Sequence, residues 1–361
     1  MKKPYTLLAF VFIVALSLLP PINFYVTAPE DNKWIWMVLG AAFFGFYLMF
    51  LDVHLFVKVL SVLVFTNCFF TSVPFESFTK YITFVGCCYF YYVCQHIEDW
   101  PMIFKALQTV VFLTLFLMVM QYMGHDSLIN FGYSHFVHYG IAGQHMQEAS
   151  FGIIISSLLI LWNPLNFLTA FAISIFCKSP WSFLCASIGL CIYLYPINPK
   201  ITQKISLFFI GIFLVASTIM GKFDANININ NDSGRWWVWE KSVLIANQKP
   251  FTGWGLGTYK LLFPPISKHY YKSDSMPYKT GHNFLVQLLF EMGYPFVIYV
   301  LLMVIVLLWL LIYQEKYLYV SGMVMIIMDA LVHFPDRELQ CILILIAFLA
   351  YIKGRHPYVR I

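Results

Sequence analysis

The chain consists of long apolar runs separated by short polar turns. The runs are about 15 to 22 residues long, which is the length that a helix needs to cross about 30 Å of hydrocarbon. Apolar residues follow one another continuously instead of alternating with a period of two, and this favours helices over a β-barrel. The pattern predicts twelve membrane helices, near residues 5–22, 34–51, 55–73, 78–94, 102–123, 149–162, 165–177, 181–195, 201–220, 283–313, 317–333 and 338–352.

Two polar segments divide these helices into three parts. We expect residues 1–220 to hold nine transmembrane helices, with a smaller outer loop near 124–148. Residues 221–281 are expected to form a large outer loop that contains an interfacial helix, and residues 282–361 to hold the last three helices. The predicted fold class is an all-α, polytopic transmembrane helix bundle of about twelve helices with a large outer loop.

Basic residues in the short loops predict the orientation of the chain. With an even number of spans they all fall on one side, which the positive-inside rule makes the cytoplasmic side. These residues are Lys2, Lys3, Lys200, Lys204, Lys316, Lys353, Arg355 and Arg360. Both termini are therefore expected in the cytoplasm and the 221–281 loop in the periplasm.

The composition excludes a soluble globular protein. Of 361 residues, 60% are apolar and 11% are charged, whereas soluble domains average about 25% charged residues. The eight cysteines lie within or at the ends of apolar runs and show neither a disulfide framework nor a C-x-x-C metal pattern. No nucleic-acid partner is expected.

Positive charge is concentrated in the 221–281 loop. This loop carries eight lysines and arginines against four aspartates and glutamates, while the whole chain has a formal charge of +5. Two interpretations stand side by side: a basic cleft for an anionic substrate, or a loop that contacts lipid headgroups.

A tryptophan-rich segment follows Ser233 and Gly234. It reads as an amphipathic helix capped by Asp232 or Ser233, with Arg235 in the first turn and three tryptophans suited to a membrane interface. Backbone N–H groups and a guanidinium at such a position can hold a phosphate together. The alternative is a surface arginine on an interfacial helix.

His282 and Asn283 open the helix predicted over 283–313. Asn283, Gln287 and Glu291 repeat every four residues and place a polar stripe on an otherwise apolar helix. A helix N-terminus disfavours imidazolium, so His282 in the first turn would be neutral and able to accept a proton. The alternative is an interfacial histidine that caps a helix.

Two further cations lie in predicted outer turns. Lys178 falls between the helices 165–177 and 181–195, and Arg337 between the last two helices. Either residue could be an ordinary interface anchor. The spacing of His135, His138 and His145 suggests a metal site only weakly, because no carboxylate or cysteine completes a ligand set.

The order of these motifs resembles the O-antigen ligase and O-antigen polymerase superfamily. The resemblance is carried by many helices, then Ser233-Gly234-Arg235, then Pro250 with Gly253 and Gly255, then Gly281-His282-Asn283-Phe284-Leu285, and its specific part covers about residues 140–340. It implies a GT-C-like membrane glycosyltransferase that needs no cofactor, nucleotide sugar or metal. Such enzymes move a glycan from an undecaprenyl-diphosphate carrier to an acceptor hydroxyl on the periplasmic side of the bacterial inner membrane.

The resemblance also implies roles for individual residues. Arg235 matches the family's diphosphate-binding arginine, and His282 matches its histidine that deprotonates or orients the acceptor hydroxyl. Lys178-Ser179 stands where many members have a Ser-Arg pair; lysine keeps the charge but loses the bidentate fork. Arg337, from topology, and Asn283, beside His282, complete the expected substrate contacts.

Two questions stay open at this stage. A ligase would use lipid A–core as acceptor and a polymerase a second lipid-linked glycan, and the motifs are common to both. From a different class, a twelve-helix protein with a basic outer cleft could be a transporter or flippase of lipid-linked oligosaccharide. Transporters usually have two similar halves and midplane charges, whereas the polar residues here gather at one outer face.

Overall fold

The described part of the chain is helical. The structure is a computed structural model and describes residues 63–123, 145–209, 211, 235–267, 281, 283–332 and 339–355, which form helices and connecting turns and no β-strand. The helices are α5 (Pro74–Gln95), α6 (Trp100–Tyr122), α7 (His145–Leu159), the 3₁₀ helix η3 (Pro164–Asn166), α8 (Phe167–Phe176), α9 (Pro180–Leu194), α11 (Arg235–Ala246), α12 (Tyr259–Ser267), α13 (Phe284–Tyr313), α14 (Tyr317–Ala330) and α15 (Leu339–Arg355). Residues 63–67 and 199–209 are helical as well. The all-α prediction is confirmed for these residues, whereas the spans predicted at 5–22 and 34–51 lie outside them.

Helix starts follow local capping chemistry. The Asp99 carboxylate accepts the Met102 N–H at 3.1 Å at the start of α6, and Pro101 lies in the first turn, where a missing N–H does no harm. At the start of α9 the Ser179 hydroxyl accepts the Ser182 N–H at 3.3 Å and Pro180 follows. These caps explain why α6 and α9 begin close to the predicted positions 102 and 181.

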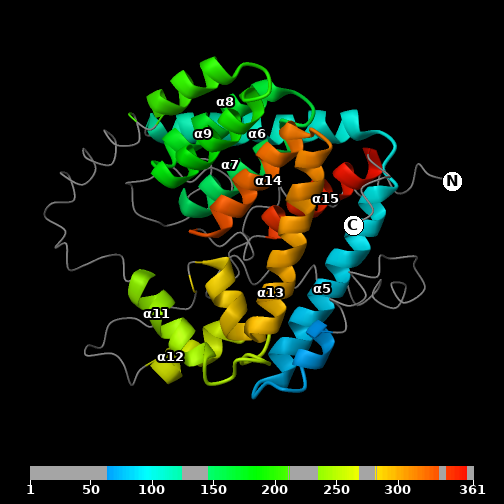
Figure 1. Cartoon of the computed structure of the whole chain (residues 1–361), viewed down its shortest axis with the longest axis vertical. Helices are drawn as coiled ribbons and strands as arrows, with labels where there is room; N and C mark the ends of the chain where they lie inside the picture. Colours follow the sequence, from blue (N-terminus) through cyan, green and yellow to red (C-terminus); the bar gives the residue numbers. More distant parts are fainter. Residues whose placement is uncertain are drawn as a thin grey trace, which may run out of the picture.

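Helix α7 is the centre of a helix bundle. Every residue from 148 to 160 is buried, and α7 packs against α6, α8, α9, α14 and α15 (Figure 1). Small residues allow close approach: Gly152 faces Ile173 of α8, and Gly322 of α14 faces Phe348 of α15. The buried residues of α7 are mostly apolar, with Glu148 and three serines as the polar exceptions.

One end of the bundle, here called the Lys178 end, joins the last turns of α6, α8 and α14. The rings of Tyr122 and Phe176 meet edge to face at 6.5 Å. The Trp181 indole Nε1–H donates to the Met328 carbonyl at 2.9 Å. The turn with Lys178 and the end of α14, which precedes the predicted Arg337 turn, therefore lie at the same end.

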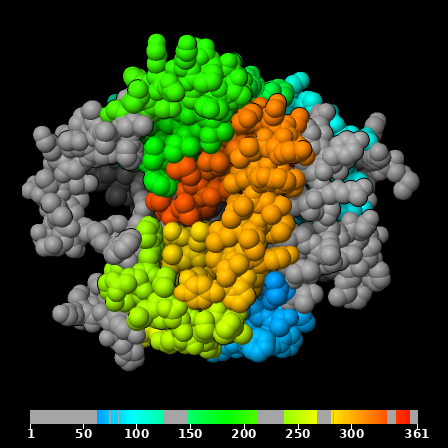
Figure 2. Space-filling view, in the orientation of Figure 1, coloured from blue at the N-terminus to red at the C-terminus, as the bar shows by residue number. Residues whose placement is uncertain are grey.

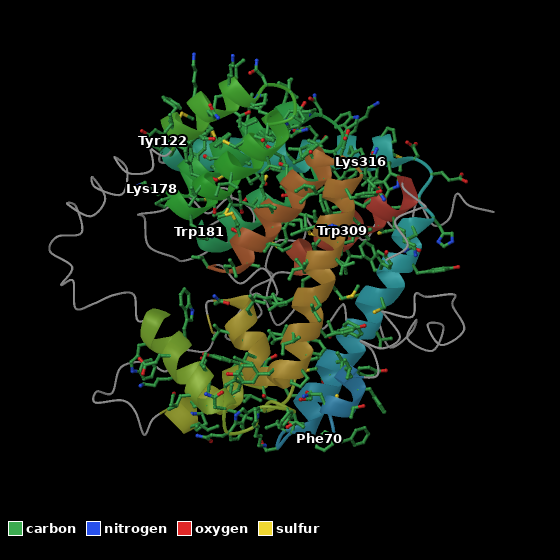
Figure 3. All side chains as sticks on the ribbon, in the orientation of Figure 1. Phe70, Tyr122, Lys178, Trp181, Trp309 and Lys316 are labelled. Carbon is green, nitrogen blue, oxygen red and sulfur yellow. The ribbon has the colours of Figure 1, made fainter. Side chains whose placement is uncertain are left out.

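The opposite end, called the Lys316 end, joins the starts of α6 and α14 to the last turns of α7 and α15. The rings of Trp100 and Tyr351 meet at 4.9 Å, and those of Phe104 and Trp162 stack at 5.9 Å. Figure 3 labels Lys178 and Lys316 on opposite sides of the bundle. Successive bundle helices thus alternate in direction.

Two of the described helices, α6 and α13, are long and apolar enough to cross a membrane, and five shorter apolar helices accompany them. The part of α13 after residue 293 exposes an apolar stripe. Ile298, Leu302, Ile305, Trp309 and Ile312 are spaced by three or four residues and all lie at the surface. This part of α13 forms the orange column along the molecular surface in Figure 2.

Helix α13 is not the single straight span predicted over 283–313. Gly293 has a non-helical backbone, with φ 78° and ψ 175°, and the chain reverses there, so that the short first segment lies beside the long second one (Figure 1). The Tyr294 N–H donates to the Pro250 carbonyl at 2.8 Å instead of continuing the helix. The remaining 294–313 segment still spans about 30 Å at 1.5 Å per residue, enough for one crossing.

Helices α11 and α12 and the first segment of α13 form a separate small lobe. Its core consists of Val238, Ile245, Tyr259, Phe263 and Phe290. The half-buried Trp237 and Trp239 pack against this core. The second segment of α13 runs antiparallel to α14 and ends at the Lys316 end, so its start and the small lobe lie toward the Lys178 end (Figure 1).

Candidate active site

Lys178 lies in the turn between α8 and α9. The Lys178 N–H donates to the Ile175 carbonyl at 3.0 Å and the Ser179 N–H to the Ser174 carbonyl at 2.9 Å, which is a Schellman cap. Lys178 occupies the left-handed position of this cap with φ 51°, a position that glycine fills with the least strain. The lysine is exposed at this end of the bundle, in a turn between two helices as predicted.

Two carboxylates are buried close to this turn. Glu148 in the first turn of α7 and Asp329 near the end of α14 are both fully buried. The Ser150 hydroxyl donates to the Asp329 carboxylate. Sequence reasoning missed both acids, although a single acidic residue inside an apolar run signals a functional or structural polar site.

Helix α11 confirms the helix predicted after Ser233 and Gly234. It begins at Arg235 and packs against α13, while the side chain of Arg235 lies outside the described part of the structure. One turn later, the Trp239 indole Nε1–H donates to the Gly281 carbonyl at 2.8 Å. The start of the arginine helix is therefore tied to the residue that precedes His282.

The start of α13 differs slightly from the prediction. His282 lies outside the described residues, and the helix begins at Phe284, so its first turn does not include position 282. Asn283 is the N-cap, and its side-chain oxygen accepts the Val286 N–H at 3.1 Å. The predicted substrate contact Asn283 thus has a capping role in the fold.

The glycine-rich turn of residues 253–257 docks on the α13 kink. The Trp254 N–H donates to the Phe290 carbonyl and the Gly255 N–H to the Glu291 carbonyl, each at 2.9 Å. Gly253 and Gly255 have positive φ values of 64° and 114°. A Cβ on Gly253 would clash with the backbone of Glu291, and a Cβ on Gly255 with the side chains of Thr71 and Ser77, so both positions require glycine.

Glu291 is the polar centre of this junction. Its side chain is 4% exposed, and its carboxylate accepts the Gly257 N–H at 2.8 Å and the Tyr259 N–H at 3.3 Å. The Gln287 amide donates to the same carboxylate at 3.4 Å. The predicted polar stripe on α13 therefore holds the small lobe together.

A segment before α5 completes the junction, and sequence reasoning missed it. The Asn67 amide donates to the Thr252 carbonyl at 2.6 Å and its oxygen accepts the Leu256 N–H at 2.8 Å. The Thr71 hydroxyl donates to the Trp254 carbonyl at 2.8 Å. The available signal was the set of polar residues, Asn67 and Thr71 among them, at the end of the apolar run 55–73.

Two groups of predicted site residues result. Arg235 and Asn283 belong to helix starts of the small lobe, whereas Lys178 belongs to the Lys178 end of the bundle together with the end of α14. Arg337 follows α14 but lies outside the described residues. Of the three predicted cations, only Lys178 has its side chain within the described part of the structure.

Comparison with known families decides the relationship. Residues 149–301, from α7 to the second segment of α13, match the family model described as O-Antigen ligase. This match supports membership of the O-antigen ligase and polymerase superfamily. This confirms the resemblance found in the motifs, and no curated protein sequence matched the chain.

The O-antigen ligase match covers most of the candidate site. Lys178, Arg235, His282 and Asn283 lie within residues 149–301, whereas Arg337 lies beyond them. Membership indicates glycan transfer of the O-antigen ligase or polymerase type, a bacterial membrane protein, and lipid-linked glycans as substrates in general terms.

Proposed function

We propose that this protein is a metal-independent glycosyltransferase of the bacterial inner membrane. It transfers a glycan from an undecaprenyl-diphosphate carrier to an acceptor hydroxyl at the periplasmic face, with both chain termini in the cytoplasm. The carrying observation is the Trp239–Gly281 hydrogen bond of 2.8 Å. It ties the helix that begins at Arg235 to the residue next to His282, so one lobe holds both a phosphate-binding and a proton-accepting candidate.

The donor would bind through its diphosphate. Arg235 at the start of α11 supplies a guanidinium beside the N–H groups of a helix start, which together favour phosphate. The exposed Lys178 adds a second cation from the bundle, and Arg337 a third from the turn after α14. The prenyl chain would lie along apolar helix surface such as the exposed stripe of α13.

The transfer needs one base and a stabilised leaving group. The His282 imidazole takes the proton of the acceptor hydroxyl while its oxygen forms a bond to the anomeric carbon of the donor glycan. The bond between that carbon and the diphosphate oxygen breaks, and the electron pair stays on the diphosphate. Arg235 and Lys178 stabilise this developing charge.

The test uses purified protein in detergent with an undecaprenyl-diphosphate-linked oligosaccharide, with and without lipid A–core. We expect Arg235→Ala and His282→Ala each to lower transfer by about a hundredfold or more. A product ladder without added acceptor would identify a polymerase, and a product that requires lipid A–core would identify a ligase.

Matched controls separate the site from general charge effects. Lys241 lies on α11 but pairs with Glu240 at 2.6 Å, and His96 lies near the opposite end of the bundle, where its ring contacts the Tyr92 carbonyl. Lys241→Ala and His96→Ala should keep transfer activity. Full transfer activity of the His282→Ala variant would refute the assigned base. If Arg235→Ala and His282→Ala lose carrier flipping in vesicles but keep transfer activity, the transporter interpretation is favoured.

A further inference from the structure

Gly281 is held on both sides by side chains from two helices. Its carbonyl accepts the Trp239 indole N–H at 2.8 Å, and its N–H donates to the Gln287 side-chain oxygen at 3.4 Å. Gly281 is buried. This carbonyl belongs to the planar peptide group that joins Gly281 to His282. The hydrogen bond from Trp239 therefore fixes the orientation of that peptide group.

Trp239 links this peptide to the arginine helix. It lies four residues after Arg235 on α11, and residues so spaced share one face of a helix. The half-buried ring packs against the core of the small lobe, which restricts its rotation. A displacement of α11 would therefore move the Arg235 position and the Gly281–His282 peptide together.

Gln287 has its amide orientation set by Glu291. Both carboxyl oxygens of Glu291 accept backbone N–H groups, so the Gln287 amide NH2 faces Glu291 and the amide oxygen faces the Gly281 N–H. Glu291 is itself held by the N–H groups of Gly257 and Tyr259. This chain of hydrogen bonds connects the glycine-rich turn to the backbone beside His282.

We propose that Trp239 and Gln287 are positioning residues, which orient His282 relative to Arg235 by clamping the peptide groups of Gly281. The proposal rests on the proposed function, because it needs His282 as the base and Arg235 at the diphosphate. A base displaced by a fraction of an ångström still permits substrate binding but slows proton transfer. The clamp should therefore govern kcat and leave the KM of the donor unchanged.

The test compares two tryptophans that make the same kind of bond. Trp239→Phe keeps an aromatic ring and removes the indole donor to Gly281. Trp254→Phe removes an equivalent donor in the same lobe, which bonds to the Ile245 carbonyl at 3.1 Å and not to Gly281. With the undecaprenyl-diphosphate-linked oligosaccharide as donor, we expect Trp239→Phe to lower kcat about tenfold at unchanged donor KM, and Trp254→Phe to keep the wild-type kcat.

A second variant covers the case in which Trp239→Phe is unstable. Gln287→Met keeps an unbranched side chain and removes both amide groups, and it should also lower kcat at unchanged donor KM. Thermal melting in detergent shows whether each variant is folded. Equal kcat values in Trp239→Phe and Trp254→Phe, wild-type kcat in folded Gln287→Met, or a loss confined to KM would overturn the clamp.

The outcomes of this test and of the functional test are distinguishable. If His282→Ala retains full transfer activity, the proposed base is wrong and the clamp has nothing to position. If His282→Ala is inactive while Trp239→Phe and Gln287→Met behave as wild type, the proposed function stands and only the clamp fails.

Discussion

Lys178 and Glu315 occupy the same unusual backbone position at opposite ends of the bundle. Each follows the last turn of a helix in a Schellman cap, with φ values of 51° and 56°. A side chain in this left-handed region costs about 1 kcal/mol relative to glycine. Both side chains are exposed, but only Lys178 lies at the end where phosphate is proposed to bind. A glycine at either position should therefore change stability equally, whereas only a glycine at Lys178 should change activity.

Lys178→Gly should therefore make the protein more stable and less active. We expect a gain of about 0.5 to 1 kcal/mol in unfolding free energy and a fall of about tenfold in kcat/KM for the lipid-linked donor, because one phosphate-binding cation is lost. Glu315→Gly should give the same stabilisation with unchanged transfer. Thermal melting in detergent and transfer kinetics measure both. Unchanged kcat/KM in Lys178→Gly would remove this residue from the donor site.

At the scale of elements, the break in α13 builds the small lobe. Gly293 has φ 78°, and a Cβ at this position would lie 2.7 Å from the Pro250 carbonyl oxygen and 2.8 Å from the Phe251 carbonyl carbon. The reversal also leaves the carbonyls of Phe290 and Glu291 to the glycine-rich turn. The lobe therefore depends on one glycine that no other residue replaces without strain.

Gly293→Ala should destabilise the protein by about 2 to 4 kcal/mol, since backbone strain and a steric clash add together. Gly211→Ala is the matched control, because a Cβ on this helical glycine meets nothing within 4 Å and should stabilise by up to about 1 kcal/mol. Thermal melting temperatures of the two variants in detergent, each compared with wild type, test this prediction. A Gly293→Ala protein as stable as wild type would mean that the chain does not reverse at this residue.

Sequence periodicity predicted the bundle helices well because their ends carry local signals. Asp99 with Pro101 and Ser179 with Pro180 mark helix starts that need no tertiary information. The break at Gly293 was missed because the apolar run continues through it, although Pro295 marks a place where a helix ladder is broken. Helix α12 was missed since Pro264 and Pro265 lie inside it.

In the candidate site, too, local sequence signals predicted some features, whereas contacts between distant segments were missed. Arg235 was correctly placed at a helix start by the capping residues before it, and Lys178 in a tight turn by Pro180 after it. The hydrogen bond from Trp239 to Gly281 joins residues 42 positions apart, and the bond from the Leu256 N–H to Asn67 joins residues 189 apart. Such pairings depend on how helices pack and leave no periodic trace in the sequence.

On the scale of the whole molecule, the bundle has two opposite ends, and each carries an aromatic pair. Tyr122 meets Phe176 at the Lys178 end, which holds the proposed donor-binding Lys178, and Trp100 meets Tyr351 at the Lys316 end. Aromatic rings gather where a membrane meets water, and basic residues in short loops mark the cytoplasmic face. Lys353, near the end of α15, lies over the Tyr91 ring, so a second basic residue belongs to the Lys316 end.

This arrangement predicts which face of a cell membrane each turn reaches. In intact cells of a bacterium with a permeable outer membrane, a membrane-impermeant maleimide should label Lys178→Cys, whereas Glu315→Cys should react only after the inner membrane is opened. Both positions are exposed and have the same left-handed backbone, so their intrinsic reactivity is matched. Wild-type protein, which has eight cysteines, measures the background labelling of the native thiols.

Labelling of Glu315→Cys from outside would reverse the proposed orientation. The lipid-linked donor would then have to be used on the cytoplasmic face, since the second segment of α13 runs from the small lobe to the Lys316 end (Figure 1). Labelling of both positions from outside would contradict alternate crossing by the bundle helices. Only the pattern with Lys178 outside and Glu315 inside places the proposed base and the phosphate-binding cations where a periplasmic acceptor can reach them.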